Sequence, residues 1–206
     1  MTNGNTQLIR FLRQECARFK EENEALNEEV QALRRYITAL QRLQETVQYF
    51  TPEQDTLALL DRTLEGALTL LDATEGSLLL IDEETDELVF VLAYGAVEET
   101  LPGYRFDRHQ GIAGWVADNV EPAIVNNVRT DLRFLSKLDE VFGFETRSMV
   151  AVPLAARGKV LGVIEVINKR SGEIFTEDDA SLLSILATLA ASALDYAASA
   201  EIEKSA

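Results

Sequence analysis

A seven-residue repeat of apolar side chains runs through the first fifty residues. The two heptad positions that form its seam are Leu12, Phe19, Leu26, Leu33, Leu40 and Val47, and, three residues before each, Ile9, Cys16, Asn23, Val30, Ile37 and Gln44. This spacing is typical of helices that wind around one another in a left-handed supercoil. No Gly or Pro interrupts the segment between Asn5 and Thr51. We therefore predict a coiled-coil dimerisation helix over residues 1–50.

The residues of the seam favour a parallel homodimer. Ile or Val at the first seam position, with Leu at the second, is the pattern of two-stranded coils. Asn23 is a buried polar residue that fixes the register, because only a matched Asn satisfies its amide. Glu15 then faces the partner's Lys20, which is an attractive pair. The alternative is a single amphipathic helix that packs on its own domain. Cys16 is interpreted as a small apolar seam residue.

Residues 51–206 are predicted to form a second domain of the α+β class. Thr51-Pro52-Glu53-Gln54 has the pattern of a helix start, and Thr176-Glu177-Asp178-Asp179 begins a second helix that runs to about Lys204. Between them lie short apolar runs punctuated by turns, at residues 77–81, 88–93, 123–125, 149–154 and 160–167. The runs are nearly continuous rather than alternating, which indicates a sheet covered on both faces. A long mixed segment between Tyr94 and Thr146 is predicted to cross over the sheet and to carry function.

Charge and composition exclude several classes of function. The net charge is -16, and all of it falls on residues 51–206, because residues 1–50 hold equal numbers of acidic and basic side chains. Such an excess argues against nucleic acid or an anionic membrane as partner. One Cys and one His leave no disulfide framework and no multi-Cys or His-rich metal site. The longest uncharged run, Ala180–Leu194, is too short to span a membrane, and no signal peptide is recognised. We expect a soluble, cytoplasmic protein.

Several motifs, in this order and spacing, resemble those of a GAF domain, a small-molecule-sensing module of signalling proteins. They are Gly76-Ser-Leu-Leu-Leu-Ile81, Gly111-Ile-Ala-Gly114-Trp115-Val116-Ala117, Asp131 with Arg133-Phe134, Ser148-Met-Val-Ala-Val-Pro-Leu154, Gly158-Lys-Val-Leu-Gly-Val163, and Asn168-Lys169. The resemblance covers residues from about 56 to 197. It implies an antiparallel sheet with helices packed on one face and a ligand pocket on the other face, under the crossover.

The resemblance also bears on the ligand. Members that bind cyclic nucleotides carry an Asn-Lys…Phe…Asp-Glu signature, which Asn168, Lys169, Phe175 and Asp179 match, whereas Ala180 stands in place of the Glu. Lys169 and Asp179 can equally form an ion pair that ties the last strand to the last helix. Bilin attachment and methionine-sulfoxide reduction need Cys residues that this domain lacks. Haem needs an axial His, and His109, the sole candidate, is interpreted as an exposed loop residue.

Nine residues are candidates for ligand binding: Gly111, Gly114, Trp115, Asp131, Arg133, Phe134, Arg147, Ser148 and Glu165. Backbone N–H groups between Gly111 and Gly114 can hold an anion at a helix start, or the glycines can serve a tight turn and close packing. Arg133 and Arg147 can clamp a carboxylate or phosphate, or pair with neighbouring acids. Glu165 interrupts an apolar run and faces either the pocket or an exposed sheet edge. Trp115 is interpreted as a core residue.

We therefore expect a non-enzymatic sensor, dimerised by its coiled coil, that binds an unidentified small molecule and acts on a signalling protein in trans. No catalytic constellation, metal site or cofactor is predicted. The alternative is a structural adaptor that recruits a kinase or phosphatase without a ligand. In that case the small residues Ala190, Ala193, Ala197 and Ala200 let a partner helix approach closely.

Overall fold

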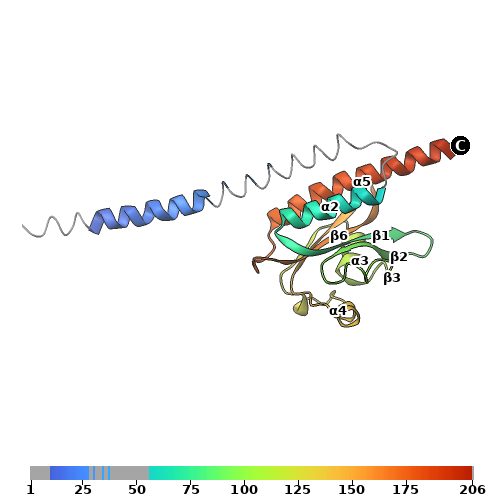
Figure 1. Ribbon diagram of the computed structural model, residues 1–206, viewed down its shortest axis with the longest axis horizontal. Coiled ribbons are helices and arrows are strands. Elements are labelled where there is room, and N and C mark those ends of the chain that lie inside the picture. The colour runs from blue at the N-terminus through green and yellow to red at the C-terminus, as the bar shows by residue number, and fades with distance from the viewer. Residues whose placement is uncertain (1–9, 28–29, 31–33, 35–36, 38–55, 206) are drawn as a thin grey trace, which may run out of the picture. The chain divides into compact units, whose positions relative to one another are not determined.

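The computed structural model describes residues 10–27, 30, 34, 37 and 56–205, with side chains up to residue 196. The chain divides into two units, residues 1–41 and 42–206, and each is described by itself. In the first unit, residues 10–27 form one helix, drawn in blue in Figure 1. The seam residues Leu12, Phe19 and Leu26 are each more than half exposed on it. The predicted seam residues Ile9, Leu33, Leu40, Gln44 and Val47 lie outside the described residues.

The second unit is built on one six-stranded antiparallel sheet. In chain order its strands are β1 (Ala73–Asp82), β2 (Glu87–Tyr94), β3 (Arg105–Asp107), β4 (Ala123–Val125), β5 (Met149–Ala156) and β6 (Lys159–Lys169). Across the sheet they lie in the order β3-β2-β1-β6-β5-β4, so β1 and β6 are its central pair. Every neighbouring pair is antiparallel. The predicted α+β class is confirmed.

Two long helices, α2 (Thr56–Leu70) and α5 (Glu177–Ser205), cover one face of this sheet, as Figure 1 shows. Leu60 and Leu64 of α2 and Leu183 of α5 are completely buried against Ile164 and Val166 of β6. At the start of α5, the Asp179 carboxylate accepts hydrogen bonds from the Thr176 backbone and hydroxyl. This is the predicted N-terminal cap of the helix. The start predicted at residues 51–54 lies outside the described residues.

The crossover between β2 and β5 covers the other face. It contains two short helices, α3 (Gly111–Asn119) and α4 (Ser136–Phe142), and one turn of 3-10 helix at Val128–Thr130. Ile112 and Val116 of α3 pack against a second core that includes Val163 of β6. The central strands are thus buried on both sides, which explains why their apolar runs are continuous.

Three elements of the crossover were not predicted: strand β3, helix α4 and the 3-10 turn at Val128–Thr130. Strand β3 has only three residues and no apolar run, because its one apolar residue, Phe106, stands between Arg105 and Asp107. Helix α4 is two turns long and ends at Gly143, which adopts the left-handed conformation (φ 64°). Strand β4 is as short as β3 but consists of three apolar residues, whereas β3 has no apolar run and α4 is too short to show a helical period. None of the described helices is both long and apolar enough to cross a bilayer.

Candidate functional site

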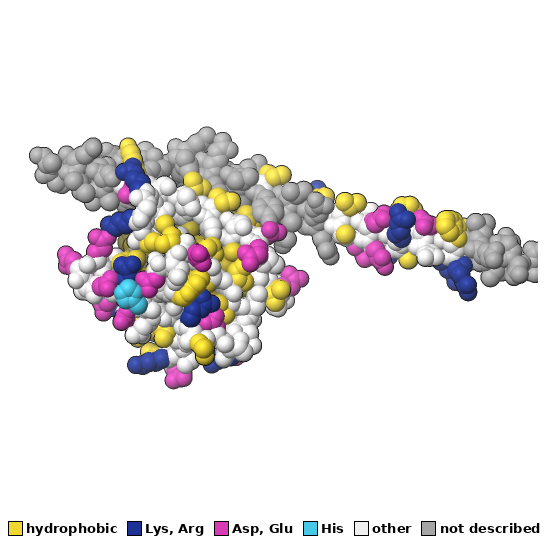
Figure 2. Space-filling view, turned by 180° about the vertical axis from the view of Figure 1, so that it is seen from behind, with side chains coloured by type: hydrophobic (Ala, Val, Ile, Leu, Met, Phe, Trp, Pro, Cys, Tyr) yellow, Lys and Arg dark blue, Asp and Glu magenta, His cyan; other side chains and the backbone are white. Residues whose placement is uncertain are grey.

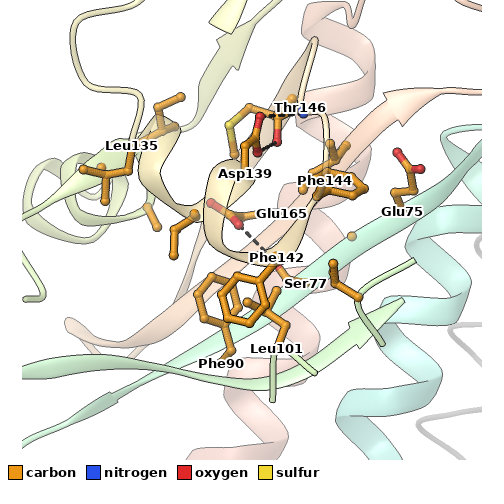
Figure 3. A pocket seen from close by; sticks show the side chains of 18 of the residues that line it. Glu75, Ser77, Phe90, Leu101, Leu135, Asp139, Phe142, Phe144, Thr146 and Glu165 are labelled. Carbon is orange, nitrogen blue, oxygen red and sulfur yellow. Dashed lines mark hydrogen bonds between the residues drawn. The ribbon is translucent and has the colours of Figure 1, made fainter. Parts of the chain in front are cut away.

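A cavity of about 90 Å³ lies between the second face of the sheet and the crossover. One water needs about 10–15 Å³ by the same measure, so the cavity has room for a small organic molecule. Its floor comes from β1, β2, β5 and β6, and its cover comes from α3, α4 and the loops around them (Figure 3). The cavity thus lies under the crossover, where the ligand pocket is predicted.

The lining of the cavity is aromatic and acidic. Five phenylalanine rings line it, those of Phe90, Phe106, Phe134, Phe142 and Phe144, and Tyr94 also borders it, although its hydroxyl is bonded to Asp61 of α2. Three carboxyl groups line it as well, those of Glu75, Asp139 and Glu165. The lining contains no Lys, Arg or His among the residues that the structure describes. The side chains of the lining that can carry a full charge near neutral pH are therefore all acidic.

Glu165 is the most deeply placed of these carboxyl groups. It lies on β6 directly opposite Ser77 of β1, and its side chain is on the same face as Val163 and Ile167. Only 7% of the residue is exposed. Ser77 Oγ donates a hydrogen bond to Glu165 Oε2 at 2.8 Å, drawn as a dashed line in Figure 3. Because β6 is central, the alternative of an exposed sheet edge is wrong.

Burial changes the acid strength of this carboxyl group. Loss of water around Glu165 raises its pKa to about 7, although the bond from Ser77 opposes the rise. The cause is the high cost of an ionised carboxylate away from water. Near neutral pH, Glu165 is therefore poised between its charged and uncharged forms. A ligand that favours either form will shift this balance.

Asp139 joins the cover of the cavity to the start of β5. Its two carboxylate oxygens accept hydrogen bonds from the Thr146 backbone N–H at 2.9 Å and the Thr146 hydroxyl at 2.7 Å. Arg129 Nη2 lies 3.7 Å from Asp139 Oδ2. This carboxylate is thus already engaged by protein groups, and it ties α4 to the strand that follows. Its position is visible at the top of Figure 3.

Asn168 organises the end of the crossover. Its side-chain oxygen accepts from the backbone N–H groups of Arg147 and Ser148, and its amide donates to Glu75 and to the carbonyl of Glu145. The residue is 6% exposed and has a positive φ of 51°. One buried amide therefore links β6, β1 and the segment before β5. It also occupies one oxygen of the Glu75 carboxylate.

Of the nine predicted ligand-binding residues, the structure places three in the cavity lining. Gly111, at the start of α3, Phe134 and Glu165 line it. Gly114, Trp115, Asp131, Arg133, Arg147 and Ser148 are not among the lining residues. A contact of any of the nine with a ligand remains a prediction.

The glycine pair at α3 has a packing role. A Cβ at Gly114 would meet the Arg108 carbonyl oxygen and the His109 carbonyl carbon, each at 2.6 Å. Gly114 is therefore required for the close approach of helix and loop. Gly111 has a φ of +79°, which a residue with a side chain rarely adopts.

Arg133 is engaged outside the cavity. Its Nε and Nη2 donate to the two oxygens of Asp131 at 2.9 and 2.6 Å. Its guanidinium also lies 4.5 Å from the ring centroid of Trp115. Pairing with Arg133 lowers the pKa of Asp131. The predicted alternative, in which Arg133 pairs with its acidic neighbour, is the one that the structure shows.

The residues of the cyclic-nucleotide signature also lie outside the cavity lining. Lys169 Nζ lies 2.6 Å from Asp179 Oδ2, and Lys169 also lies over the ring of Phe175. Both side chains of the ion pair are close to nine-tenths buried. The pair ties β6 to α5, as the structural interpretation of these residues predicts.

His109 lies on the surface, among acidic side chains (cyan in Figure 2). Its Nδ1 is 2.8 Å from Asp118 Oδ2, and its Nε2 is 3.5 Å from Asp86 Oδ2. The bond to Asp118 raises the pKa of His109. His109 does not line the cavity. No group of three or more metal-ligating side chains occurs within the described residues.

Sequence reasoning missed several residues of the cavity. Ser77 is hidden in an apolar run, and only its pairing across the sheet with Glu165 reveals its role. Asp139 and Thr146 are seven residues apart and meet because α4 turns the chain back. Among the missed rings, Phe142 and Phe144 flank Gly143.

Comparison with known proteins places these features in a family. The family model described as "GAF domain" matches residues 53–195. Over 149 residues the chain is 32% identical to the probable 3',5'-cyclic phosphodiesterase pde-5 of Caenorhabditis elegans, which covers 68% of this chain and 20% of that protein. It is 29% identical over 151 residues to the dual 3',5'-cyclic-AMP and -GMP phosphodiesterase 11A of Takifugu rubripes, with 68% and 17% coverage. The chain thus spans a fifth or less of the length of these relatives.

Solved structures share the fold. The GAF domain of a phosphoenolpyruvate-protein phosphotransferase from Coxiella burnetii superimposes with a TM-score of 0.70 at 18% identity, covering 81% of this chain and 98% of that one. A free methionine-R-sulfoxide reductase of Neisseria meningitidis, solved in complex with its substrate, gives 0.66 at 21% identity, with 82% and 93% coverage. GAF domains are small-molecule-sensing regulatory modules that occur in phosphodiesterases and sensors. The chain, matched over 53–195 by the family model, belongs to the GAF domain family.

Proposed function

We propose that this chain is a non-enzymatic sensor that binds a small molecule in the cavity above Glu165 and acts on a partner protein in trans. The observation that carries the proposal is the cavity itself, with a buried carboxyl group held by one hydrogen bond at its floor. A buried ionisable group costs stability unless it is satisfied, so a purely structural core has no reason to retain it. A bound ligand supplies the missing partners.

The contacts around the cavity support transmission of a signal to α5. A ligand that draws the crossover closer changes the segment that Asn168 holds against β6. The next residue, Lys169, is paired with Asp179 in the first turn of α5. Asn168 and Lys169, two adjacent residues of β6, therefore connect the floor and the cover of the cavity to helix α5. Such a short chain of contacts allows a ligand to bias the position of a helix.

Absence of catalysis and a cytoplasmic location belong to the same proposal. The two aliphatic hydroxyl groups of the lining, on Ser77 and Thr146, each donate to a carboxyl group, and no His, Lys or Cys of the described residues lines the cavity to form a catalytic group with them. The described residues also hold no cluster of metal ligands. The acidic charge of residues 51–206 suits a protein partner rather than nucleic acid or an anionic membrane.

The exposed seam of residues 10–27 supports dimerisation through a coiled coil. Three large seam side chains, Leu12, Phe19 and Leu26, are between 52% and 59% exposed, and a second copy of the helix would bury them. Sedimentation of the full chain tests this part. We expect a dimer that Leu26→Glu dissociates, whereas Ala17→Glu, outside the seam, leaves it intact. A monomer at micromolar concentration contradicts dimerisation.

Ligand binding is tested by thermal unfolding of the full chain with a panel of named probes: cyclic AMP, cyclic GMP, adenine, phenylalanine, benzoate and benzamidine. A ligand at a hundredfold excess over its Kd adds about 2.7 kcal/mol to the free energy of unfolding, which is readily measured. We expect at least one probe to stabilise the wild type and to lose its effect in Glu165→Gln. Glu140→Gln is the matched control, because Glu140 is exposed on α4 and does not line the cavity. A flat panel contradicts the sensor and favours the ligand-free adaptor.

A further inference from the structure

Resting on the proposed function, we infer that the ligand of this cavity is a small organic cation, an amine or amidinium on an apolar body, whose nitrogen donates to Glu165. Three independent features of the lining lead to this chemistry: the sign of its charges, the free acceptor capacity of Glu165, and its aromatic rings.

The charges in the lining exclude an anion as the favoured ligand. Glu75, Asp139 and Glu165 face the cavity, and no basic side chain of the described residues lines it. The two arginines considered as anion clamps are engaged elsewhere: Arg133 is bonded to Asp131, and Arg147 is exposed beside Glu145. A phosphate or carboxylate would therefore enter next to like charges without a counter-ion.

The start of α3 is the one feature of the lining that favours an anion. Gly111, Ile112 and Ala113 line the cavity, and the first turn of a helix carries a partial positive charge. This partial charge belongs to backbone groups at one side of the cavity, and it is opposed by the carboxyl groups of Glu75 and Asp139 and by that of Glu165 when it is ionised. The balance of the lining remains negative.

Glu165 has acceptor capacity that the protein does not use. An ionised carboxylate accepts about four hydrogen bonds. Among the described residues, Ser77 is the only donor to this side chain. By contrast, Asp139 accepts two bonds from Thr146 and faces Arg129, and Glu75 accepts from Asn168. An ammonium or amidinium group would complete the shell of Glu165 with charge-assisted bonds.

The aromatic rings favour the same ligand. Five phenylalanine side chains line the cavity, and the rings of Phe90 and Phe106 lie 5.7 Å apart, so these two form one stretch of apolar wall. Ring faces attract cations as well as apolar groups. In Figure 3, Phe90, Phe142 and Leu101 are grouped next to Glu165 and Ser77. An apolar body can thus lie on the rings while its nitrogen reaches the carboxylate.

The pH dependence of binding distinguishes two kinds of ligand. A cation needs the ionised form of Glu165, whereas a hydrogen-bond acceptor needs its protonated, neutral form. The titratable groups that line the cavity are Glu75 from β1, Tyr94 from β2, Asp139 from α4 and Glu165 from β6. Burial raises the pKa of Glu165 to about 7, and burial together with the bond to Asp61 raises that of Tyr94 to about 12. A cation binds the ionised form of Glu165 and therefore binds more tightly as the pH rises from 6 to 8. An acceptor or anion shows the opposite trend.

The experiment compares probes of matched shape and different charge by isothermal titration of the full chain. The pairs are benzamidine with benzoate, and phenethylamine with hydrocinnamate; benzamide and phenethyl alcohol are the neutral members, and cyclic GMP is added. We expect the two cations to bind at least tenfold more tightly than their acidic partners, and to gain affinity from pH 6 to pH 8. Glu165→Gln should remove both effects, and Glu140→Gln should remove neither.

The outcomes separate the two proposals. Binding of cyclic GMP or of the carboxylates in preference to the cations overturns the inference and leaves the sensor function standing. Preference for the neutral members, or affinity that falls as the pH rises, also overturns the inference alone. No binding by any probe, together with a flat panel in thermal unfolding, overturns both. Cation binding that persists unchanged in Glu165→Gln overturns the assignment of Glu165.

Discussion

Ser77 and Glu165 stand directly opposite each other on the two central strands, with the serine hydroxyl donating to the buried carboxyl group at 2.8 Å. Their neighbours on the same face of the sheet include Leu79 and Val163, both completely buried. A polar pair at the centre of an apolar face lowers the stability of the fold, because both groups lose their hydrogen bonds to water when the chain folds. We interpret the pair as the floor of a binding site, and the first two predictions follow from it.

The stability of the protein should depend on pH through Glu165. Its pKa is about 7 in the folded chain against an ordinary value of 4.5, so the folded state holds the proton more tightly than the unfolded state. The free energy of unfolding therefore falls as the pH rises from about 4.5 to about 7. Over this interval, the difference between the two pKa values lowers the free energy of unfolding by about 3 kcal/mol.

Glu165→Gln removes this dependence, because the amide does not titrate. At pH 8 we expect the variant to unfold at higher urea concentration than the wild type, and at pH 4 we expect the difference to shrink. Urea unfolding at several pH values measures it, with Glu140→Gln as the control. A gap between variant and wild type that stays constant with pH contradicts the account.

The bond between Ser77 and Glu165 should appear as coupling in a double-mutant cycle. Ser77→Ala leaves the buried carboxylate without its donor, which costs about 1–3 kcal/mol at pH 8. In the Glu165→Gln background the same change should cost less, since no charge is left unsatisfied. Urea unfolding measures both losses of stability. If Ser77→Ala lowers the free energy of unfolding equally in the two backgrounds, the bond contributes nothing to stability.

Lys169 should contribute to stability and not to ligand affinity. Lys169→Met leaves Asp179 as a buried charge without its partner, which is expected to cost about 3 kcal/mol. Benzamidine affinity, measured by titration calorimetry below the unfolding temperature, should stay close to that of the wild type. Lost affinity without lost stability would place Lys169 in the binding site.

Gly114 should tolerate no side chain. In Gly114→Ala the new methyl group meets backbone atoms of Arg108 and His109 at 2.6 Å, so helix α3 has to move. We expect a lower melting temperature and weaker ligand binding. Gly66→Ala is the matched control, because Gly66 lies in α2 with nothing within 4 Å, and Ala there should add about 0.5–1 kcal/mol. Equal melting temperatures for the two variants would contradict this packing role.

The sequence predicts the sheet better than the crossover. Runs such as residues 149–154 and 160–167 identify β5 and β6 because burial on both faces removes polar positions from them. Both strands extend further than predicted, to Ala156 and Lys169; the two residues added at the end of β6, Asn168 and Lys169, are polar and so fall outside its apolar run. Strand β3 escapes prediction because it has one apolar residue between two charged ones, whereas the equally short β4 is apolar throughout, and the seven residues of α4 are too few to establish a helical period.

The candidate site was predictable where one residue breaks a local pattern. Glu165 is a charge inside an apolar strand, and Gly111 and Phe134 belong to the crossover motifs. Ser77, Asp139 and Thr146 depend on partners 88 and seven residues away, which only the folded chain brings together. For Arg133 the sequence leaves both an anion clamp and pairing with a neighbouring acid open, because only the folded chain shows that Asp131 and Trp115 engage it.

The most direct test of the account is a carbon-13 NMR titration of the Glu165 side-chain carboxyl group, assigned by its loss in Glu165→Gln. Without ligand, the account predicts a titration midpoint near the value of about 7 that burial imposes. With saturating benzamidine, the midpoint should move well below this value, because a cation in contact with the group stabilises its charged form. A midpoint that benzamidine leaves in place would contradict the claim that Glu165 recognises the ligand.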